Sequence, residues 1–381
     1  MFTCIEAANP DLEEKGYAPT WVTSSMLAYD GLNSFIVEIL ARFKWRSVYM
    51  IRDATADVNP WFGDAYNSVM HAVRSNVPDN QISGHILTEE EVNATDFRFL
   101  QKLQETSRIV LYFGNTARLR LIAHEMFKRG MMASGEYVVI AVEPYPSDNM
   151  THGSWGDFQW EQGDSLDADL EFAWRSIMLI TLAESESERK TFFAPRFPVW
   201  ANMSKDFYGF DIPSSSFEIN FSQVMAYEGM LIFLKILEET IQEGDLSDIT
   251  DGRSFAQRFH NRTIELPSGN VTFSKQGNRY MDLLLRDWAV STQSWKPVLK
   301  FVSVTRSVIP LNDIIDWPNT TRNTPPLNEP LCGYTGAAAG CIKKLDILPF
   351  VAGVTALAIA ILAGIGGFAY SEGQQQRDGG S

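Results

Sequence analysis

The chain has 381 residues, with 47 acidic against 32 basic side chains and a formal net charge of −15. Because 45% of its residues are hydrophobic and only 21% are charged, it is too apolar to belong to the intrinsically disordered proteins. The acidic balance and the lack of any Lys/Arg-rich run exclude the usual nucleic-acid-binding proteins, which need a cationic patch. The length allows two or three domains, or two lobes that share a hinge.

The N-terminal part alternates helical and strand patterns. Four stretches have the apolar spacing of helices: residues 30–43, 59–76, 95–106 and 117–129. Four short apolar runs are typical of buried strands: residues 47–51, 85–87, 109–113 and 137–142. Repeated helix–strand alternation is the signature of a parallel sheet that helices cover on both faces, so the sequence predicts an α/β fold.

The pattern changes after residue 143. A long loop rich in Gly, Asp and Trp spans 143–169, and a further strand is predicted at 177–182. Residues 223–242 form a helix that is apolar on nearly every side and should therefore be deeply buried. After this helix the sequence predicts strands joined by short turns, at residues 263–266, 271–274, 280–290 and 298–304.

Residues 347–370 contain no charged side chain. At about 1.5 Å per residue, a helix of this length exceeds the hydrocarbon core of a bilayer, which is about 30 Å thick. Pro349 suits the first turn of such a helix, and Phe350 and Tyr370 suit the membrane interfaces. We therefore predict a single transmembrane helix over 347–370, followed by a short cytoplasmic tail, 371–381.

Two kinds of evidence bear on the orientation in the membrane, and they disagree. Lys343 and Lys344 precede the span and only Arg377 follows it, so the positive-inside rule would place the N-terminal part in the cytoplasm. Seven Asn-x-Ser/Thr sequons instead indicate glycosylation in a secretory lumen. They begin at Asn93, Asn149, Asn202, Asn220, Asn261, Asn270 and Asn319. We give more weight to the sequons and expect a type I plasma-membrane protein with an extracellular N-terminus.

The three cysteines fit the same orientation. Cys332 and Cys341 lie close together in a Pro/Gly-rich stretch before the span, as in a small extracellular disulfide loop. Cys4 is then left over, and the N-terminus has neither the basic nor the apolar region of a signal peptide. We therefore expect that upstream sequence, including a partner for Cys4, is missing from this chain.

The sequence contains no motif of catalysis or metal binding. It lacks phosphate-loop, zinc-protease, Cys-x-x-Cys, nucleophile-elbow and dinucleotide-binding motifs. The five histidines are scattered, and none has a Cys or a second His at the spacing of metal ligands. We therefore expect no catalytic residue, no metal site and no cofactor, and we expect the N-terminal part to bind a ligand.

Three groups of residues resemble the motifs of one receptor family. The first group is the helix ILEETIQEG at 236–244, preceded by Tyr227, Glu228 and Gly229. The second comprises the segments LPSGNVTF at 266–273 and GNRYMD at 277–282. The third lies directly before the span and comprises Trp317-Pro318, Pro325-Pro326, PLCGY at 330–334 and Cys341. In order and position they resemble the ectodomain of natriuretic-peptide-type receptor guanylate cyclases. The resemblance covers nearly the whole chain.

The resemblance implies a type I periplasmic-binding-protein-like domain, in which two α/β lobes are joined by three crossings. Residues 1–316 would form this ligand-binding region with its first lobe incomplete, and 317–346 a juxtamembrane Pro/Cys segment. If part of the first lobe is missing, helix 223–242 should be buried on one apolar face and partly exposed on the other. One face carries Tyr227, Leu231, Leu234 and Ile241, and the other carries Met225, Ile232, Phe233 and Ile236.

The resemblance also implies a function. The protein would be a single-pass cell-surface receptor that binds an extracellular peptide hormone or small molecule. In the full-length protein, which forms homodimers in this family, ligand binding would be coupled across the lipid bilayer to a cyclase that makes cyclic GMP. No cyclase domain lies within the 381 residues, so whether the protein is an enzyme stays open. The alternative is a clearance-type receptor, which has a very short tail and no cyclase activity.

The resemblance offers two candidate ligand contacts, Phe62 and His85, which match an aromatic residue and a histidine that contact peptide in the vertebrate receptors. The neighbouring positions depart from the family pattern, because Tyr66 stands where Glu is expected, and Leu87 and Thr88 replace Glu and Phe. The alternative is structural, with Phe62 packed in the core and His85 satisfied within its strand. The net charge of −15 favours a cationic ligand through long-range steering.

Overall fold

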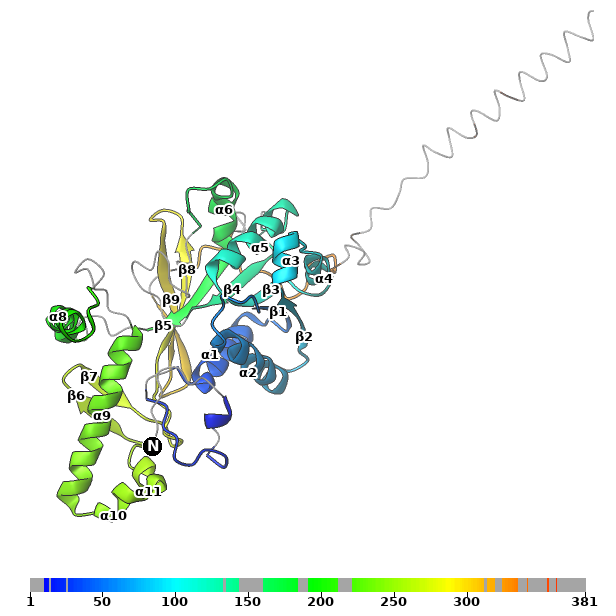
Figure 1. Cartoon of the computed structure of the whole chain (residues 1–381). Helices are drawn as coiled ribbons and strands as arrows, with labels where there is room; N and C mark the ends of the chain where they lie inside the picture. The colour runs from blue at the N-terminus through cyan, green and yellow to red at the C-terminus, as the bar shows by residue number, and fades with distance from the viewer. Residues whose placement is uncertain are drawn as a thin grey trace, which may run out of the picture. The chain divides into compact units, whose positions relative to one another are not determined.

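Figure 1 shows the computed structural model of the chain. It describes residues 10–13, 15–24, 27–132, 135–143, 160–183, 191–211, 221–311, 314–318 and 324–334, together with Cys341, Thr355 and Ile361. The chain divides into two compact units, Met1–Pro330 and Leu331–Ser381, and each is described by itself.

The N-terminal unit is built around an eight-stranded sheet with the order β10-β9-β8-β5-β4-β3-β1-β2. Its five parallel strands are β1 (Ser47–Asp53), β2 (Gln81–Leu87), β3 (Ile109–Phe113), β4 (Val138–Val142) and β5 (Ile177–Leu182). Three antiparallel strands continue the sheet beyond β5: β8 (Leu283–Ala289), β9 (Ser294–Val302) and β10 (Ser307–Pro310). The chain leaves β1 for β2 on one side and returns to β3 on the other, which makes a topological switch between β1 and β3.

Helices cover both faces of this sheet. The helices are α1 (Tyr29–Phe43) and α2 (Trp61–Asn76) on one face, and α4 (Phe99–Thr106), α5 (Thr116–Lys128) and α6 (Asp167–Ala173) on the other. Because successive side chains of a strand point to opposite faces, β1 contributes to two separate cores. Val48 and Met50 pack with the first pair of helices, whereas Tyr49 and Ile51 pack with the second group. The α/β fold class predicted from the sequence is confirmed.

A second group of elements follows β5. It comprises α8 (Phe197–Tyr208), α9 (Phe221–Glu243), α10 (Leu246–Thr250), α11 (Gly252–Gln257), β6 (Thr263–Leu266) and β7 (Gly269–Thr272). β6 and β7 form a two-stranded antiparallel sheet of their own. A small core in which Ile232 and Ile236 of α9 pack against Phe255 of α11 and Phe259 joins these two helices to the hairpin.

The segments that connect the large sheet to the second group of elements are hydrogen-bonded to one another. The backbone N–H of Arg279 donates to the carbonyl of Thr23 at 2.8 Å, and the N–H of Thr23 donates to the carbonyl of Gly277 at 3.1 Å. The N–H of Ala183, directly after β5, donates to the carbonyl of Asp282 at 2.8 Å. Three separate parts of the chain therefore meet next to β8.

The long helix α9 is buried on one side only. Met225, Ile232 and Ile236 are at most 1% exposed, whereas Leu234 and Ile241 are 50% and 53% exposed. The prediction of a deeply buried helix was therefore wrong for one face. The alternative expectation, that one apolar face would be partly exposed, is confirmed.

Other sequence predictions need local correction. The helix predicted at 95–106 begins only at Phe99, as α4. A separate helix, α3 (Glu89–Ala94), lies before it and was not predicted; Thr95 ends α3 with a φ of 54° in the left-handed region. Within the predicted loop at 143–169, helix α6 begins at Asp167. The edge strand β10 was not predicted, since its four residues form no apolar run. The short 3-10 helices Pro10–Glu13 and Trp174–Ser176 were missed as well.

The C-terminal unit contains the predicted disulfide. Cys332 and Cys341 are bonded, with Cα atoms 5.5 Å apart, which confirms the pairing. Among the residues that the structure describes, no helix is both long and apolar enough to cross a bilayer. The predicted span 347–370 lies outside those residues except at Thr355 and Ile361, and Cys4 and the tail 371–381 also lie outside them.

Candidate ligand-binding surface

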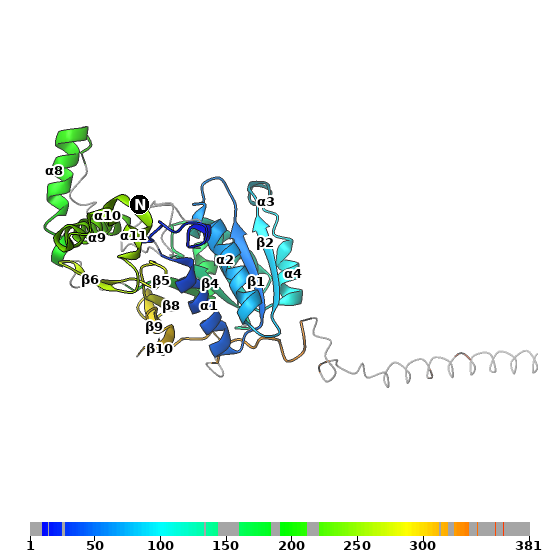
Figure 2. The same cartoon turned by 90° about the horizontal axis from the view of Figure 1, so that it is seen from below.

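Strand β2 lies at one edge of the large sheet. In the described part of the chain it pairs only with β1, and β10 forms the opposite edge; Figure 2 shows both strands. β2 differs from the inner strands in exposure, because β1, β3, β4 and β5 are buried almost throughout, whereas six of its seven residues are partly or fully exposed. Its Ile86 side chain is 48% exposed. An edge strand with free backbone groups can accept an extended peptide as an additional strand.

His85 lies on β2, and its side chain is on the face of the sheet that α4 covers. Its ring stacks on Phe99 of α4, with centroids 4.3 Å apart and planes 9° from parallel. Its Nε2 atom lies 2.9 Å from Oε1 of Glu91, and the two side chains are 23% and 27% exposed. The side chain is therefore held in place on two sides and is still accessible, as a contact residue would have to be.

Helix α3 places acidic side chains beside β2. Thr88 begins the helix with a capping box, in which its hydroxyl accepts from the N–H of Glu91 and its own N–H donates to Glu91 at 2.9 Å. The first turn also carries Glu89 and Glu90, both exposed. Burial acts to raise the pKa of Glu91, but hydrogen bonds from Thr88 and the nearby His85 together lower it. The end of β2 is therefore an anionic, solvent-facing surface, which we call the edge surface: His85, Ile86, Glu89, Glu90 and Glu91.

The structure does not bring Phe62 to this surface. Phe62 belongs to the core under α1 and α2 and is fully buried, with Trp61 in edge-to-face contact at 5.5 Å. His85 packs from the opposite face of the sheet, since it pairs with Ile51 in the register of β1 and β2. Tyr66 and Leu87 are also buried, at 6% and 0% exposure. Of the two candidate contacts, only His85 is accessible to a ligand. Phe62 instead packs in the core.

Polar side chains gather where β1 and β3 end, at the topological switch. The Thr55 hydroxyl lies 2.8 Å from Oδ1 of Asp53 and 2.8 Å from Oδ1 of Asp57. Asn115, which caps α5, donates to Asp57 at 3.4 Å, and Arg118 approaches the same carboxylate at 3.4 Å. In open α/β sheets, ligands bind outside the carboxyl ends of the strands at such a switch. We call this group the switch cluster: Asp53, Thr55, Asp57, Asn115 and Arg118.

The two carboxylates of the switch cluster differ in their surroundings. Burial raises the pKa of Asp53, which is only 1% exposed. The hydrogen bond from Thr55 lowers the pKa of Asp57, which faces solvent. A side chain at Gly114 would place its Cβ 2.3 Å from the Cβ of Asp53, so only glycine permits this close approach. The N–H of Ala54 donates to the carbonyl of Leu87 at 3.0 Å, which links the cluster to the end of β2.

The switch cluster was not predicted from the sequence. The sequence did contain an indication of this cluster, since Asp53 follows one predicted buried strand and Asn115 follows another. The carboxyl ends of parallel strands meet at one edge of a sheet, and this rule would have grouped these residues.

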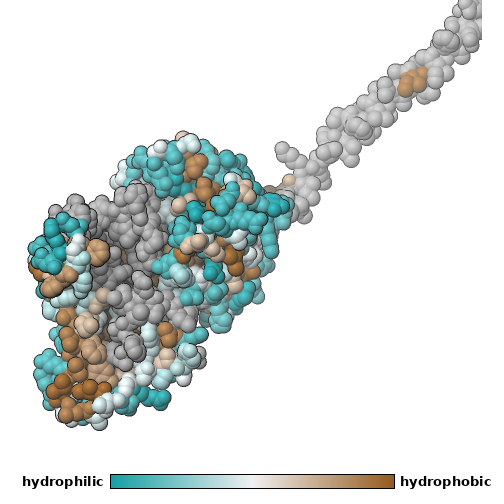
Figure 3. Space-filling model, viewed as in Figure 1, coloured by the Kyte–Doolittle hydropathy of each residue, from teal (hydrophilic) through white to brown (hydrophobic). Residues whose placement is uncertain are grey.

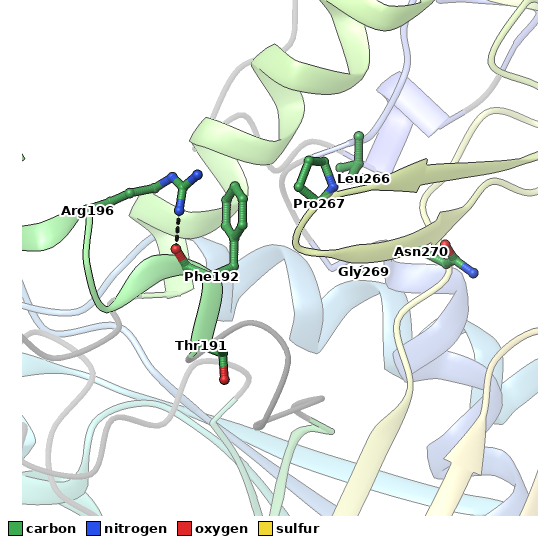
Figure 4. A pocket seen from close by; sticks show the side chains of 7 residues that line it. All are labelled: Thr191, Phe192, Arg196, Leu266, Pro267, Gly269 and Asn270. Carbon is green, nitrogen blue, oxygen red and sulfur yellow. Dashed lines mark hydrogen bonds between the residues drawn. The ribbon is translucent and has the colours of Figure 1, made fainter.

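A pocket of about 820 Å³ lies elsewhere, between residues 191–196 and the β6–β7 hairpin. Figure 4 shows its lining, in which the Arg196 guanidinium lies 3.4 Å from the ring centroid of Phe192. Asn270, one of the sequon residues, is exposed at its rim, with its side chain directed away from Phe192. Arg196 is the one charged residue among the lining residues that the structure describes, and as a cation it does not favour a cationic ligand.

Four of the seven predicted glycosylation sites lie in the described residues. Asn93 is on α3, Asn202 on α8, Asn261 before β6 and Asn270 on β7, and all four are exposed. Exposure is a requirement for modification, and these four meet it. Asn149, Asn220 and Asn319 lie outside the described residues.

Comparison with known proteins decides the family. The family described as "Receptor family ligand binding region" matches residues 7–291, which include β1 to β8 and the whole edge surface. The chain belongs to this family. Its fold is therefore that of the periplasmic-binding-protein-like receptors, as the motifs indicated.

Named relatives of this ligand-binding region are similar at low identity. Receptor-type guanylate cyclase gcy-28 of Caenorhabditis elegans is 24% identical over 266 residues, covering 68% of this chain and 19% of that protein. Atrial natriuretic peptide receptor 2 of Rattus norvegicus is 23% identical over 352 residues, covering 88% of this chain and 31% of the receptor. Atrial natriuretic peptide receptor 3 of Homo sapiens is 22% identical over 257 residues, 67% of this chain and 44% of the receptor. The chain thus matches less than half the length of each relative.

Proposed function

We propose that this chain is the ligand-binding part of a single-pass cell-surface receptor guanylate cyclase, which in the full-length protein couples ligand binding to cyclic GMP synthesis. The observation that carries this proposal is the match of the receptor ligand-binding family to residues 7–291. Relatives that are named as receptor guanylate cyclases and natriuretic peptide receptors support it. The Cys332–Cys341 disulfide and the exposed sequons support an extracellular position in the plasma membrane, and the charge-free stretch 347–370 supports the span.

The proposed ligand is a basic peptide that binds at the edge surface. Glu89, Glu90 and Glu91 lie beside the open edge of β2, and the whole chain has a net charge of −15. A cationic ligand is drawn to such a surface by long-range attraction, which salt weakens. An extended peptide can add its backbone to β2 while His85 and Ile86 contact its side chains.

Charge reversal on α3 tests the proposed ligand site. We expect Glu89→Lys/Glu90→Lys to lower the affinity for basic peptides by about tenfold, because two nearby attractive charges become repulsive. Binding would be measured on cells that display the chain, with a library of basic peptides at two salt concentrations. The matched control is Glu161→Lys/Glu171→Lys, which makes the same charge change at exposed positions in and before α6. An equal loss in both variants would show that only net charge matters, and no loss in either would remove the edge surface from the proposal.

A histidine pair supplies a second test. His85→Ala removes the stacked, partly exposed ring from the edge surface, whereas His71→Ala removes an exposed ring from α2. We expect weaker peptide binding for the first variant and unchanged binding for the second. The same result in both would argue that His85 is a structural residue of its strand.

The second candidate function is a clearance-type receptor without cyclase activity. Atrial natriuretic peptide receptor 3 is among the relatives that match, and the extracellular architecture would be the same. The transcript downstream of Ser381 separates the two. A coding region for kinase-like and cyclase domains excludes the clearance type, whereas stop codons directly after the tail in several transcripts exclude the cyclase.

A further inference from the structure

In the described part of the chain, the backbone of β2 pairs with β1 and with no other strand. The N–H of Gln81 donates to the carbonyl of Arg46 at 2.9 Å, and the carbonyl of Leu87 accepts from the N–H of Ala54 at 3.0 Å. The N–H and C=O of one strand residue point to the same side, and successive residues alternate between the two sides. The odd-numbered residues from Gln81 to Leu87 therefore pair with β1.

The even-numbered residues of β2 direct their N–H and C=O groups away from β1, toward the edge of the sheet that Figure 2 shows. Of these residues, Gly84 and Ile86 are exposed, and Ile82 is half-buried. A Cβ at Gly84 would lie 2.5 Å from the Tyr66 hydroxyl oxygen, so only glycine fits in the middle of this edge. The three residues present three N–H donors and three C=O acceptors to a further strand.

The opposite edge of the sheet is less suited to a further strand. Directly after β10, the N–H of Leu311 donates to the carbonyl of Val298 on β9 at 2.9 Å. By the same alternation, Ile309 also faces β9, whereas Val308 and Pro310 face outward. Proline has no N–H, which leaves Val308 as the one outward donor of this four-residue strand. A peptide is therefore expected to pair with β2 rather than with β10.

The two faces of the sheet beside the β2 edge differ in chemistry. His85 lies on the α4 face, where its ring contacts Phe99 and its Nε2 atom lies 2.9 Å from Glu91. The even-numbered side chains lie on the other face, because successive residues alternate. There Ile82 packs at the margin of the core under α1 and α2, and Ile86 is 48% exposed. One face is therefore acidic at this edge, and the other is apolar.

We propose that the ligand of this edge is an extended peptide whose basic and apolar side chains alternate, paired with the outward groups of Ile82, Gly84 and Ile86. Directly opposed residues of neighbouring strands place their side chains on the same face. A basic residue opposite His85 lies beside the Glu91 carboxylate. Apolar residues opposite Gly84 and Ile86 cover the glycine backbone and the exposed Ile86 side chain. This inference rests on the proposed function and adds the register and sequence pattern of the ligand.

Residue-resolved hydrogen exchange of the full chain tests the register without any ligand. We expect the amides of Ile82, Gly84 and Ile86 to exchange much faster than those of Ser83 and His85, which donate to β1. Equal protection of both sets would overturn the proposal, because the edge would then be covered already. Protection of the first set that rises with protein concentration would also overturn it, because a second copy of the chain would be the occupant.

Two peptides of equal charge and composition test the sequence pattern. Lys-Val-Lys-Val-Lys-Val alternates, whereas Lys-Lys-Lys-Val-Val-Val does not. We expect the first to bind about tenfold more tightly and to slow exchange at Ile82, Gly84 and Ile86. Equal binding, or binding that leaves these amides unprotected, would overturn the pairing but keep the edge surface as a site for basic peptides. Binding of neither peptide would contradict the proposed function as well.

N-methylation of the alternating peptide tests strand pairing directly. A strand directs only every second N–H to a given neighbour, so methylation of either the three lysines or the three valines should abolish binding, but not both. Loss with the valine set indicates antiparallel pairing, and loss with the lysine set indicates parallel pairing. Loss with both sets or with neither would contradict the proposal.

Matched proline variants test the same contact from the side of the protein. Ile86→Pro removes one outward donor from β2, and Val308→Pro removes one from β10. We expect about tenfold weaker binding of the alternating peptide for the first variant and unchanged binding for the second. Equal binding to both folded variants would contradict the pairing. If Ile86→Pro does not fold, the methylated peptides decide the question on the original chain.

Discussion

At the scale of single residues, the most tightly enclosed ion pair among the described residues is that of Glu228 and Arg279. Their side chains are 0% and 3% exposed and lie 2.6 Å apart. Ser268 donates to the other carboxylate oxygen at 2.7 Å, and Arg279 also donates to the carbonyl of Ser24 at 3.2 Å. This network joins α9, the β6–β7 turn and the segments that lead into the large sheet. Since each buried charge depends on its partners, removal of one should cost far more than loss of an exposed pair.

The first prediction concerns this pair. Glu228→Gln leaves the Arg279 charge buried without its counter-charge, and we expect the free energy of unfolding to fall by about 3–5 kcal/mol. Glu239→Gln breaks the more exposed Arg262–Glu239 contact, with side chains 36% and 29% exposed, and should cost about 1 kcal/mol or less. Urea unfolding followed by circular dichroism measures both. Equal, small losses would mean that the buried pair does not stabilise the fold as described.

At the scale of elements, helix α9 presents two apolar faces with different surroundings. One face packs on α11 and the β6–β7 hairpin through Ile232 and Ile236. The other exposes Met230, Leu234 and Ile241, and Figure 3 shows a hydrophobic area over α9 and α10. Exposed apolar area of this kind is unusual unless further protein covers it.

Glutamate substitutions on the two faces of α9 form the second prediction. Ile232→Glu would bury an unpaired charge and should destabilise the chain by several kcal/mol. Leu234→Glu would place the charge in solvent and should change the stability by about 0.5 kcal/mol or less. Thermal unfolding of the two variants compares them directly. If both unfold equally early, the Leu234 face is packed in the folded protein.

The helices and strands also show how much of the fold could be predicted from the sequence. Inner strands such as β5 were predicted with the bounds that the structure has, because a continuous apolar run can only be buried on both faces. The exposed side of α9 could be foreseen only as an alternative, since apolarity does not reveal whether a partner is present. β10 and α3 escaped detection because one depends on pairing with β9 and the other on a capping box at Thr88.

The candidate site was less predictable than the fold. His85 was found through a family resemblance, and its stacking on Phe99 could not be deduced from spacing. Phe62 was chosen in the same way, but the register of the sheet and the direction of α2 turn it into the core. The switch cluster depends on strand order, which unites residues from two loops only when the sheet forms.

At the scale of the whole molecule, the proposed edge surface and the contacts of the segment after β10 lie at different strands of one sheet. The edge surface lies on β2, at one end of the strand order, whereas Asp316 contacts β8 and Asn328 contacts the start of β1. β1 pairs with β2 along its whole length, so the two regions involve one strand pair.

The central claim is that an extracellular basic peptide binds at the β2 edge, and site-specific photo-crosslinking tests it most directly. A photoreactive amino acid would be placed at Ile86 or, as the matched control, at Ile309 on β10, which is similarly exposed at the opposite edge of the same sheet. Cells displaying each variant would be illuminated with a tagged basic peptide. We predict a crosslink at Ile86 that unlabelled peptide abolishes, and none at Ile309. A specific crosslink at Ile309 alone, or at neither position while the peptide still binds, would contradict the assignment of the ligand to this edge.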